Sequence, residues 1–165
     1  MAKKDPAKLK KVSVHLPFGI GGAEWEADTT ERRAAWSLYI ELVTRIAVQP
    51  LETERGLVGE ALMSLYSLFG TTREILKQAS PDVGASRESV GGIAIAVLNK
   101  GLRPFIAKWH PLWQAWEAQR STQMNPKEHE QNWSEEPKLR LELESLRQEL
   151  EQYAKALAII AGVKE

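Results

Sequence analysis

The N-terminal part of the chain alternates apolar and polar residues in a way that predicts a short β-hairpin. In the segment KVSVHLPF, every second residue from Val12 to Leu16 is apolar and the residues between them are polar. The glycines of GIGG supply a turn, and AEWEAD supplies a second strand in which Trp25 is the apolar anchor. Because an isolated two-stranded ribbon is only marginally stable, we expect this hairpin to pack on a larger element.

After the hairpin, apolar residues recur at the spacing of amphipathic helices. Asp28 followed by Glu31 is typical of a capping box, and it predicts a helix that Pro50 ends. A second helix is expected to start near Thr53 and to stop before Pro81. Both apolar faces are wider than a two-helix seam requires, which favours a helical bundle.

The next stretch predicts two helices that meet at a glycine. The first begins around Ser86, and Gly101 is expected to end it in the left-handed conformation. Pro104 suits the first turn of the following helix, and Pro111 predicts a kink within it. The spacing favours burial of one stripe on this helix, made of Phe105, Trp109, Leu112, Trp113 and Trp116.

A polar linker with a short helix, residues 121–134, separates this region from the last helix. Asn125 followed by proline indicates the start of the short helix, whose residues KEHEQ (127–131) we interpret as solvated. Ser134 is the expected N-cap of the final helix, and Gly162 is the expected end of it.

The final helix carries a heptad pattern. The seam comprises Leu139, Leu143, Leu146, Leu150, Tyr153, Leu157 and Ile160. With Leu143 at position a, Glu142 and Arg147 occupy the g and following e positions, which suits a parallel partner helix. Two interpretations stay open: the helix packs on its own bundle, or it forms a coiled coil with a second copy or another protein.

Together these patterns predict a mainly α fold. We expect a bundle of four to five helices with a short N-terminal β-hairpin and a long heptad-patterned C-terminal helix. The chain divides into a basic flexible arm (1–11), a helical core with the strand pair (12–120), the linker (121–134) and a C-terminal amphipathic helix (135–163).

Composition narrows the classes of function. The chain of 165 residues is 43% hydrophobic and 27% charged, has a formal net charge of zero and contains no cysteine. The lack of cysteine excludes disulfides, thiol nucleophiles and cysteine-ligated metals. The basic segment MAKKDPAKLKK is not followed by the apolar core of a signal peptide, and the longest apolar run, residues 91–98, is too short to span a bilayer. We therefore expect a cytoplasmic protein with no membrane span.

Catalytic signatures do not occur in the sequence. His15, His110 and His129 are far apart, and none has the spacing of a metal ligand with another histidine or a pair of carboxylates. No G-x-S-x-G nucleophile elbow occurs, and FGIGG lacks the lysine of a phosphate-binding loop. We expect no cofactor and no enzymatic activity.

We expect a partner to bind at two surfaces: the Arg103–Trp116 part of the segment LNKGLRPFIAKWHPLWQAW (98–116), and the exposed side of the heptad helix. The candidate partner-binding residues on the rim of that segment are Arg103, Lys108, His110 and Trp113. An alternative is a nucleic-acid site, in which Trp109 or Trp113 stacks on bases and the cations are Arg73, Lys77, Lys100, Arg103 and Lys108. The balanced net charge favours an ordinary solvated surface over that alternative.

A family resemblance rests on three segments of the chain, which occur in this order: SLFGTTREIL, IAIAVLNKGLRPFIAKWHP and EQNWSEEPKLRLELESLRQELEQYAKAL. The chain resembles small, mostly uncharacterised helical proteins encoded in bacterial biological-conflict (anti-phage) loci, over most of residues 12–163. The resemblance implies an accessory component that works through protein contacts. We therefore expect a non-catalytic interaction or regulatory protein whose partner is a defence-system effector, another protein, or a second copy in a homodimer.

Overall fold

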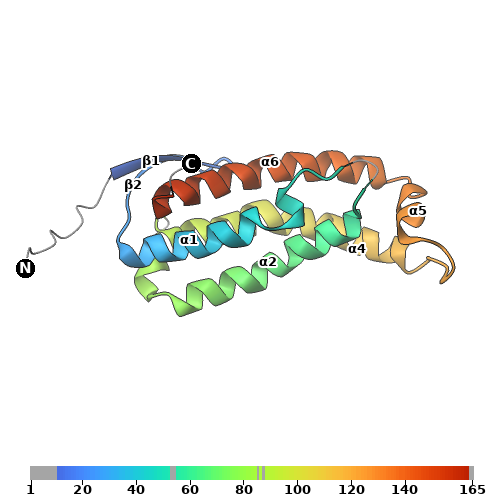
Figure 1. Cartoon of the computed structure of the whole chain (residues 1–165), viewed down its shortest axis with the longest axis horizontal. Coiled ribbons are helices and arrows are strands. Elements are labelled where there is room, and N and C mark those ends of the chain that lie inside the picture. The colour runs from blue at the N-terminus through green and yellow to red at the C-terminus, as the bar shows by residue number, and fades with distance from the viewer. Residues whose placement is uncertain (1–10, 53–54, 85, 87, 164–165) are drawn as a thin grey trace, which may run out of the picture.

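The computed structural model describes residues 11–52, 55–84, 86 and 88–163. Two antiparallel strands, β1 (Lys11–Leu16) and β2 (Gly21–Glu26), come first (Figure 1). The helices that follow are α1 (Thr29–Val43), η1 (Ile46–Val48), α2 (Val58–Gln78), η2 (Pro81–Gly84), α3 (Val90–Ala96), η3 (Val97–Leu102), α4 (Arg103–Glu117), α5 (Pro126–Gln131) and α6 (Glu136–Ala161). The predicted mainly α fold is confirmed. Residues 1–10 of the expected basic arm lie outside the described residues, and Lys11 begins β1.

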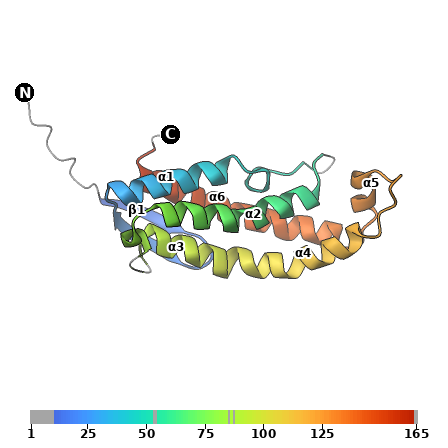
Figure 2. The ribbon, with the colours of Figure 1, turned by 90° about the horizontal axis from the view of Figure 1, so that it is seen from below.

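Four helical rods run along the long axis of the molecule. They are α1, α2, the α3–η3–α4 rod and α6, and each runs opposite to the one before it in the chain (Figures 1 and 2). The hairpin lies at one end, where β1 packs on α6, and α5 lies across the other end. This up-down-up-down arrangement is that of an antiparallel four-helix bundle.

The hairpin joins the bundle through its buried face and its turn. Val14, Leu16 and Trp25 are buried, as the alternation predicts. In the turn, Phe18 adopts a positive φ of 57°, and its backbone N–H donates to Glu149 Oε2 of α6 at 2.7 Å. Docking on α6 gives the two strands the support that an isolated ribbon lacks.

Local capping signals placed several helix ends well. Asp28 Oδ1 accepts from the N–H three residues later at 2.8 Å, and Asn125 Oδ1 accepts from the N–H two residues later at 2.8 Å. Gly162 ends α6 with a φ of 78°. Ser134 is not the N-cap of α6, because Glu135 takes that position.

Tertiary contacts move other helix ends away from the predicted places. The first helix ends at Val43 and does not continue to Pro50. Arg45 leaves the helix in an extended conformation, and its guanidinium donates to Glu41 Oε2 at 2.9 Å and to Ser67 Oγ of α2 at 2.6 Å. The segment after α1 is therefore held against α2.

Two helices begin later in the chain than the sequence pattern predicts. The expected start near Thr53 lies outside the described residues, and α2 begins at Val58. The third helix begins at Val90 and not at Ser86, because Ser89 is its N-cap and accepts from a backbone N–H at 3.1 Å.

Gly101 does not end a helix, and this overturns the prediction of two helices meeting there. Helices α3, η3 and α4 form one continuous rod, and the π-helical turn η3 lies immediately before Arg103 and Pro104. A Cβ at Gly101 would lie 2.5 Å from the ring of Phe18. Gly101 is therefore needed for the close approach of the hairpin turn and not for a left-handed φ.

We expect Gly101→Ala to destabilise the protein by about 1–2 kcal/mol, because the added methyl group collides with a ring whose own backbone N–H is bonded to α6. The matched control is Gly70→Ala in α2, where the nearest heavy atom to a new Cβ is 4.0 Å away. That control should stabilise the helix by up to about 1 kcal/mol. Urea unfolding followed by circular dichroism measures both, and equal effects of the two substitutions would contradict the close contact.

The heptad seam of α6 lines the core of its own chain. Its seven residues, Leu139, Leu143, Leu146, Leu150, Tyr153, Leu157 and Ile160, are at most 6% exposed. Helix α6 packs mainly on α1 and also contacts β1, η1 and α2. Glu142 and Arg147 also pair within the chain, Glu142 with Lys108 and Arg147 with Glu144 and Glu151. The heptads allow two kinds of packing, and in this structure the seam packs within its own chain.

Helix α5 closes one end of the bundle, and the interpretation of KEHEQ as a solvated segment is wrong for two of its residues. His129 is 5% exposed and Glu130 is 2% exposed. The His129 ring stacks on Trp116 with centroids 4.6 Å apart, and its backbone oxygen accepts from Trp116 Nε1 at 2.9 Å. The sequence pattern missed this burial because it depends on a tryptophan from α4.

Glu130 caps the start of α2 from a distant part of the chain. Its Oε1 accepts from the backbone N–H of Val58 at 2.8 Å, and its Oε2 accepts from that of Gly59 at 3.1 Å. The first amides of a helix have no partner within the helix, and the helix dipole favours a negative charge there. The buried carboxylate therefore gives the first backbone N–H groups of α2 their hydrogen-bond acceptors, and it holds α5 against the start of α2.

Replacement of Glu130 tests this cap. Glu130→Gln should lower the free energy of unfolding by about 1–3 kcal/mol, because it removes the charge and one of two acceptors from a buried site. Glu128→Gln is the matched control, since it makes the same change on an exposed residue of the same helix. Chemical denaturation at neutral pH measures both, and a cost as small as that of the control would contradict the capping role.

Candidate functional site

The outer sides of α2 and α4 form one surface, which we call the α2–α4 face (Figure 2). It comprises Met63, Tyr66, Phe69, Arg73, Arg103, His110 and Trp113. Tyr66 and His110 stack across the two helices with ring centroids 5.2 Å apart. The Arg103 guanidinium lies over the Phe69 ring, 5.2 Å from its centroid. These two contacts place the side chains of the two helices on a common surface.

One end of the α2–α4 face is a basic groove of about 430 Å³. Its lining includes Arg73, Arg103 and the aromatic rings of Tyr66 and Phe69, and no acidic residue. Arg103 donates to Asn99 Oδ1 at 3.1 and 3.2 Å, which leaves its charge uncompensated. Within the described part of the chain, neither arginine forms an ion pair. The groove therefore attracts anions.

The centre of the face exposes apolar and aromatic side chains. Tyr66 is 53% exposed and Met63 is 49% exposed. Large apolar side chains that lie together at the surface of a protein mark interaction sites more often than isolated ones do. Both rings of the Tyr66–His110 stack are available there for contact with a partner, since neither residue is buried.

The other end of the face is a second hollow, of about 550 Å³, that is lined by Trp113 and by three acids. They are Glu60, Glu117, which pairs with Arg120 at 2.7 Å, and Glu130, which caps α2. Trp113 fits here because residue 59 is glycine: a Cβ at Gly59 would lie 2.3 Å from the indole. The Trp113 Nε1 is buried and has no hydrogen-bond partner in the described chain. The α2–α4 face thus has arginines at one end and glutamates at the other, with apolar groups between.

The structure groups three of the four predicted partner-binding residues. Arg103, His110 and Trp113 lie on the α2–α4 face. Lys108 lies on the other side of α4, where its Nζ donates to Glu142 of α6 at 2.7 and 3.0 Å. Lys77 of the predicted basic patch pairs with Glu74 at 3.6 Å.

Three members of the face, Met63, Tyr66 and Phe69, were missed by the sequence pattern. Tyr66 and Met63 look like ordinary surface positions of α2, because nothing near them in sequence indicates a binding site. Their significance comes from α4, which places His110 and Arg103 beside Tyr66 and lines one hollow with both Met63 and Trp113. Arg73 was expected only as part of a nucleic-acid site.

The predicted burial of the α4 stripe is correct for Trp109 and wrong for Leu112. Trp109 is fully buried, whereas Leu112 is 46% exposed. The indole Nε1 of Trp109 donates to Glu142, and Lys108 Nζ lies 4.8 Å from the centroid of the Trp109 ring. The hydrogen bond from Lys108 is the largest cause that lowers the pKa of Glu142, followed by that from Trp109, and desolvation opposes both.

Lys108→Met should raise the pKa of Glu142, because it removes the largest cause of the lowering. When the pKa of a carboxyl is lower in the folded protein than in the unfolded protein, the ionised carboxyl stabilises the fold at pH values above the unfolded-state pKa. This stability is lost as the pH falls through the folded-state pKa. The variant should thus be less stable by a few tenths to about 1 kcal/mol at neutral pH, since the pair is partly exposed, and equal to the wild type in strong acid.

Urea unfolding at about pH 7 and about pH 3 measures this difference. The N–H resonance of the Trp109 indole reports the titration of Glu142 directly. If the pH midpoint of that resonance were the same in the variant and the wild type, Lys108 would not be the main cause of the lowered pKa of Glu142.

The described residues bear on two other classes of site, a metal centre and a membrane span. They contain no group of three or more His, Cys, Asp or Glu side chains that could hold a metal ion. One described helix, Val90–Glu117, is long and apolar enough to cross a membrane by length and composition, and half of its most apolar window is buried in the bundle. The core helix of a bundle meets the same criterion.

Comparison with protein-family models, with curated proteins and with solved structures found no match. The function is therefore argued from the α2–α4 face itself.

Proposed function

We propose that the protein is a non-catalytic interaction component whose α2–α4 face binds an amphipathic helix of another protein. The observation that best supports this proposal is the basic groove, which contains Arg73 and Arg103, has no acidic lining and lies beside the exposed Tyr66. Apolar anchors of a partner helix fit the hollows between α2 and α4, and acidic residues at one of its ends fit the two arginines. Glu60 at the far end of the face sets the direction in which such a helix lies, since Glu117 there is paired with Arg120 and Glu130 caps α2.

The resemblance to small helical proteins of anti-phage loci supports a partner within such a defence system. In that setting the protein is an accessory component, and the partner helix belongs to an effector or regulator. This assignment rests on the resemblance, whereas the class of ligand rests on the charges and apolar groups of the α2–α4 face.

Binding of single-stranded nucleic acid is the second candidate function. The exposed Tyr66–His110 stack beside two arginines could hold bases and phosphates. Lys108 and Lys77 do not add to this site, because each pairs with a glutamate. With a net charge of zero and only two arginines in the groove, an acidic protein segment is the better fit.

A charge-reversal variant tests the proposal with a defined probe. The probe is a fluorescent helical peptide with leucines on one face and glutamates at one end, and its match has lysines in place of the glutamates. We expect only the glutamate peptide to bind the wild type, and Arg73→Glu combined with Arg103→Glu to weaken it at least tenfold, or about 1.4 kcal/mol. Fluorescence anisotropy measures both.

The control variant is Arg33→Glu combined with Lys138→Glu, which makes the same change of charge on exposed residues outside the face. It should bind the glutamate peptide within about twofold of the wild type. Equal binding of both peptides, or equal loss in both variants, would contradict the proposal. Tighter binding of a single-stranded DNA that weakens steeply with salt would instead favour the second candidate.

A further inference from the structure

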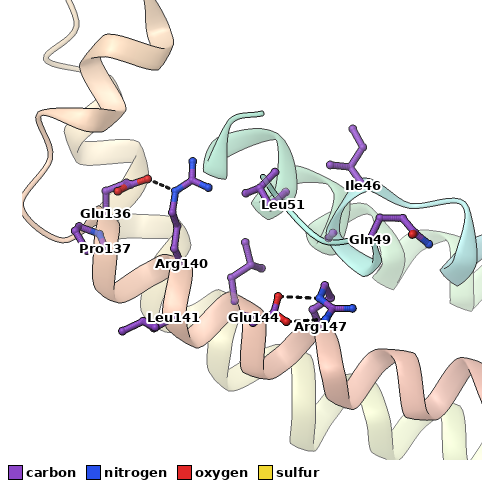
Figure 3. A pocket seen from close by; sticks show the side chains of 12 residues that line it. Ile46, Gln49, Leu51, Glu136, Pro137, Arg140, Leu141, Glu144 and Arg147 are labelled. Carbon is purple, nitrogen blue, oxygen red and sulfur yellow. Dashed lines mark hydrogen bonds and ion pairs between the residues drawn. The ribbon is translucent and has the colours of Figure 1, made fainter. Parts of the chain in front are cut away.

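A separate pocket lies where the segment after α1 crosses the first half of α6 (Figure 3). Its volume is about 590 Å³, which is in the range of sites for small molecules. Its walls come from residues 46–51, from α2 and from α6. It does not include the arginines or the aromatic stack of the α2–α4 face.

The walls of this pocket are mainly apolar and partly uncovered. Leu141 on α6 is 74% exposed and Ile46 opposite is 52% exposed, and both line the pocket. Leu51 and Leu143 continue the apolar lining. Covering such side chains stabilises a complex in proportion to the apolar area removed from water.

The two arginines of the pocket differ in how fully they are paired. Arg147 donates through Nε and Nη2 to Glu144 at 2.8 and 2.6 Å, and through Nη1 to Glu151 at 3.1 Å. Arg140 donates through Nε to Glu136 and through Nη1 to the backbone oxygen of Glu52 at 3.5 Å, but its Nη2 has no hydrogen-bond partner in the described chain. A buried donor without an acceptor is costly, so Arg140 is the group that a ligand can satisfy.

The charges of the pocket cancel. Glu136 neutralises Arg140, and Glu144 neutralises Arg147, as the dashed lines in Figure 3 mark. No positive charge is left over for an anionic ligand, which would also lie near two carboxylates. A neutral acceptor suits this site better than a carboxylate or a phosphate does.

We infer that this pocket binds a small uncharged molecule with an apolar body and a carbonyl oxygen. The carbonyl accepts from the Arg140 guanidinium, and the apolar body covers Leu141, Leu143 and Ile46. The inference does not rest on the proposed function, because it uses another arginine and another kind of ligand; of the residues that line this pocket, Ile46 also lines the hollow at the Trp113 end of the α2–α4 face.

Three probes with the same chain length separate the chemistries: hexanamide, hexanoate and hexylamine. The measurement is the change in backbone and arginine side-chain resonances of the full-length isotope-labelled protein on titration. We expect hexanamide to shift the resonances of residues 46–51 and of Arg140, with hexanoate weaker and hexylamine without specific shifts.

Two variants test the two parts of the site. Arg140→Met with Glu136→Gln removes the donor without leaving an unpaired carboxylate, and it should weaken hexanamide about tenfold. Leu141→Gln alters only an exposed wall, so it should fold normally and also weaken binding. Ile159→Gln, an exposed position on the same helix outside the pocket, is the control and should leave binding unchanged.

The outcomes that overturn the inference are distinct. Equal shifts with all three probes would indicate nonspecific apolar association, and tightest binding of hexanoate would indicate an anion site. Shifts of the pocket resonances with protein concentration alone would indicate that a second copy covers the pocket. None of these outcomes affects the test of the α2–α4 face, which uses different variants and a peptide probe.

Discussion

The burial of the α6 seam is the interaction on which the rest of the structure depends. Fully burying one leucine or isoleucine contributes roughly 1.5–3 kcal/mol, whereas an exposed ion pair contributes about 1 kcal/mol at most. The seam therefore outweighs the ion pairs along the same helix. It also sets the positions of the groups that α6 presents to its neighbours: Glu149 holds the hairpin turn, and Glu142 holds Lys108 and Trp109 of α4.

The features that could be predicted from the sequence are those encoded by neighbouring residues. The hairpin follows from alternation, Asp28 and Gly162 follow from capping rules, and the heptads locate α6. The continuity of the helix through Gly101 could not be predicted, because the reason for a glycine there is the close approach of a ring from the hairpin 83 residues earlier and not a helix end. The same holds for Glu130, whose hydrogen-bond partners belong to the start of α2.

The candidate site was predictable to a similar extent. Composition indicated Arg103, His110 and Trp113, and helical geometry places these on one side of α4. Lys108 differs because its charge is paired on α6, and pairing between distant residues leaves no local trace in the sequence. Tyr66 shows the converse, since a plain surface residue gains a role from the helix beside it. The pocket at Arg140 was not predicted, because it forms between segments far apart in the chain.

The cap of α2 by Glu130 has a consequence for the order in which the chain folds. During synthesis the start of α2 leaves the ribosome 72 residues before the carboxylate that its first amide binds. The chief packing partner of α1 is α6, the last helix to emerge. Completion of this bundle must therefore wait until α6 has been made. Until then α1 is covered only by elements made before α6, such as α2 and α3, and a stalled or truncated chain would be a substrate for chaperones and proteases.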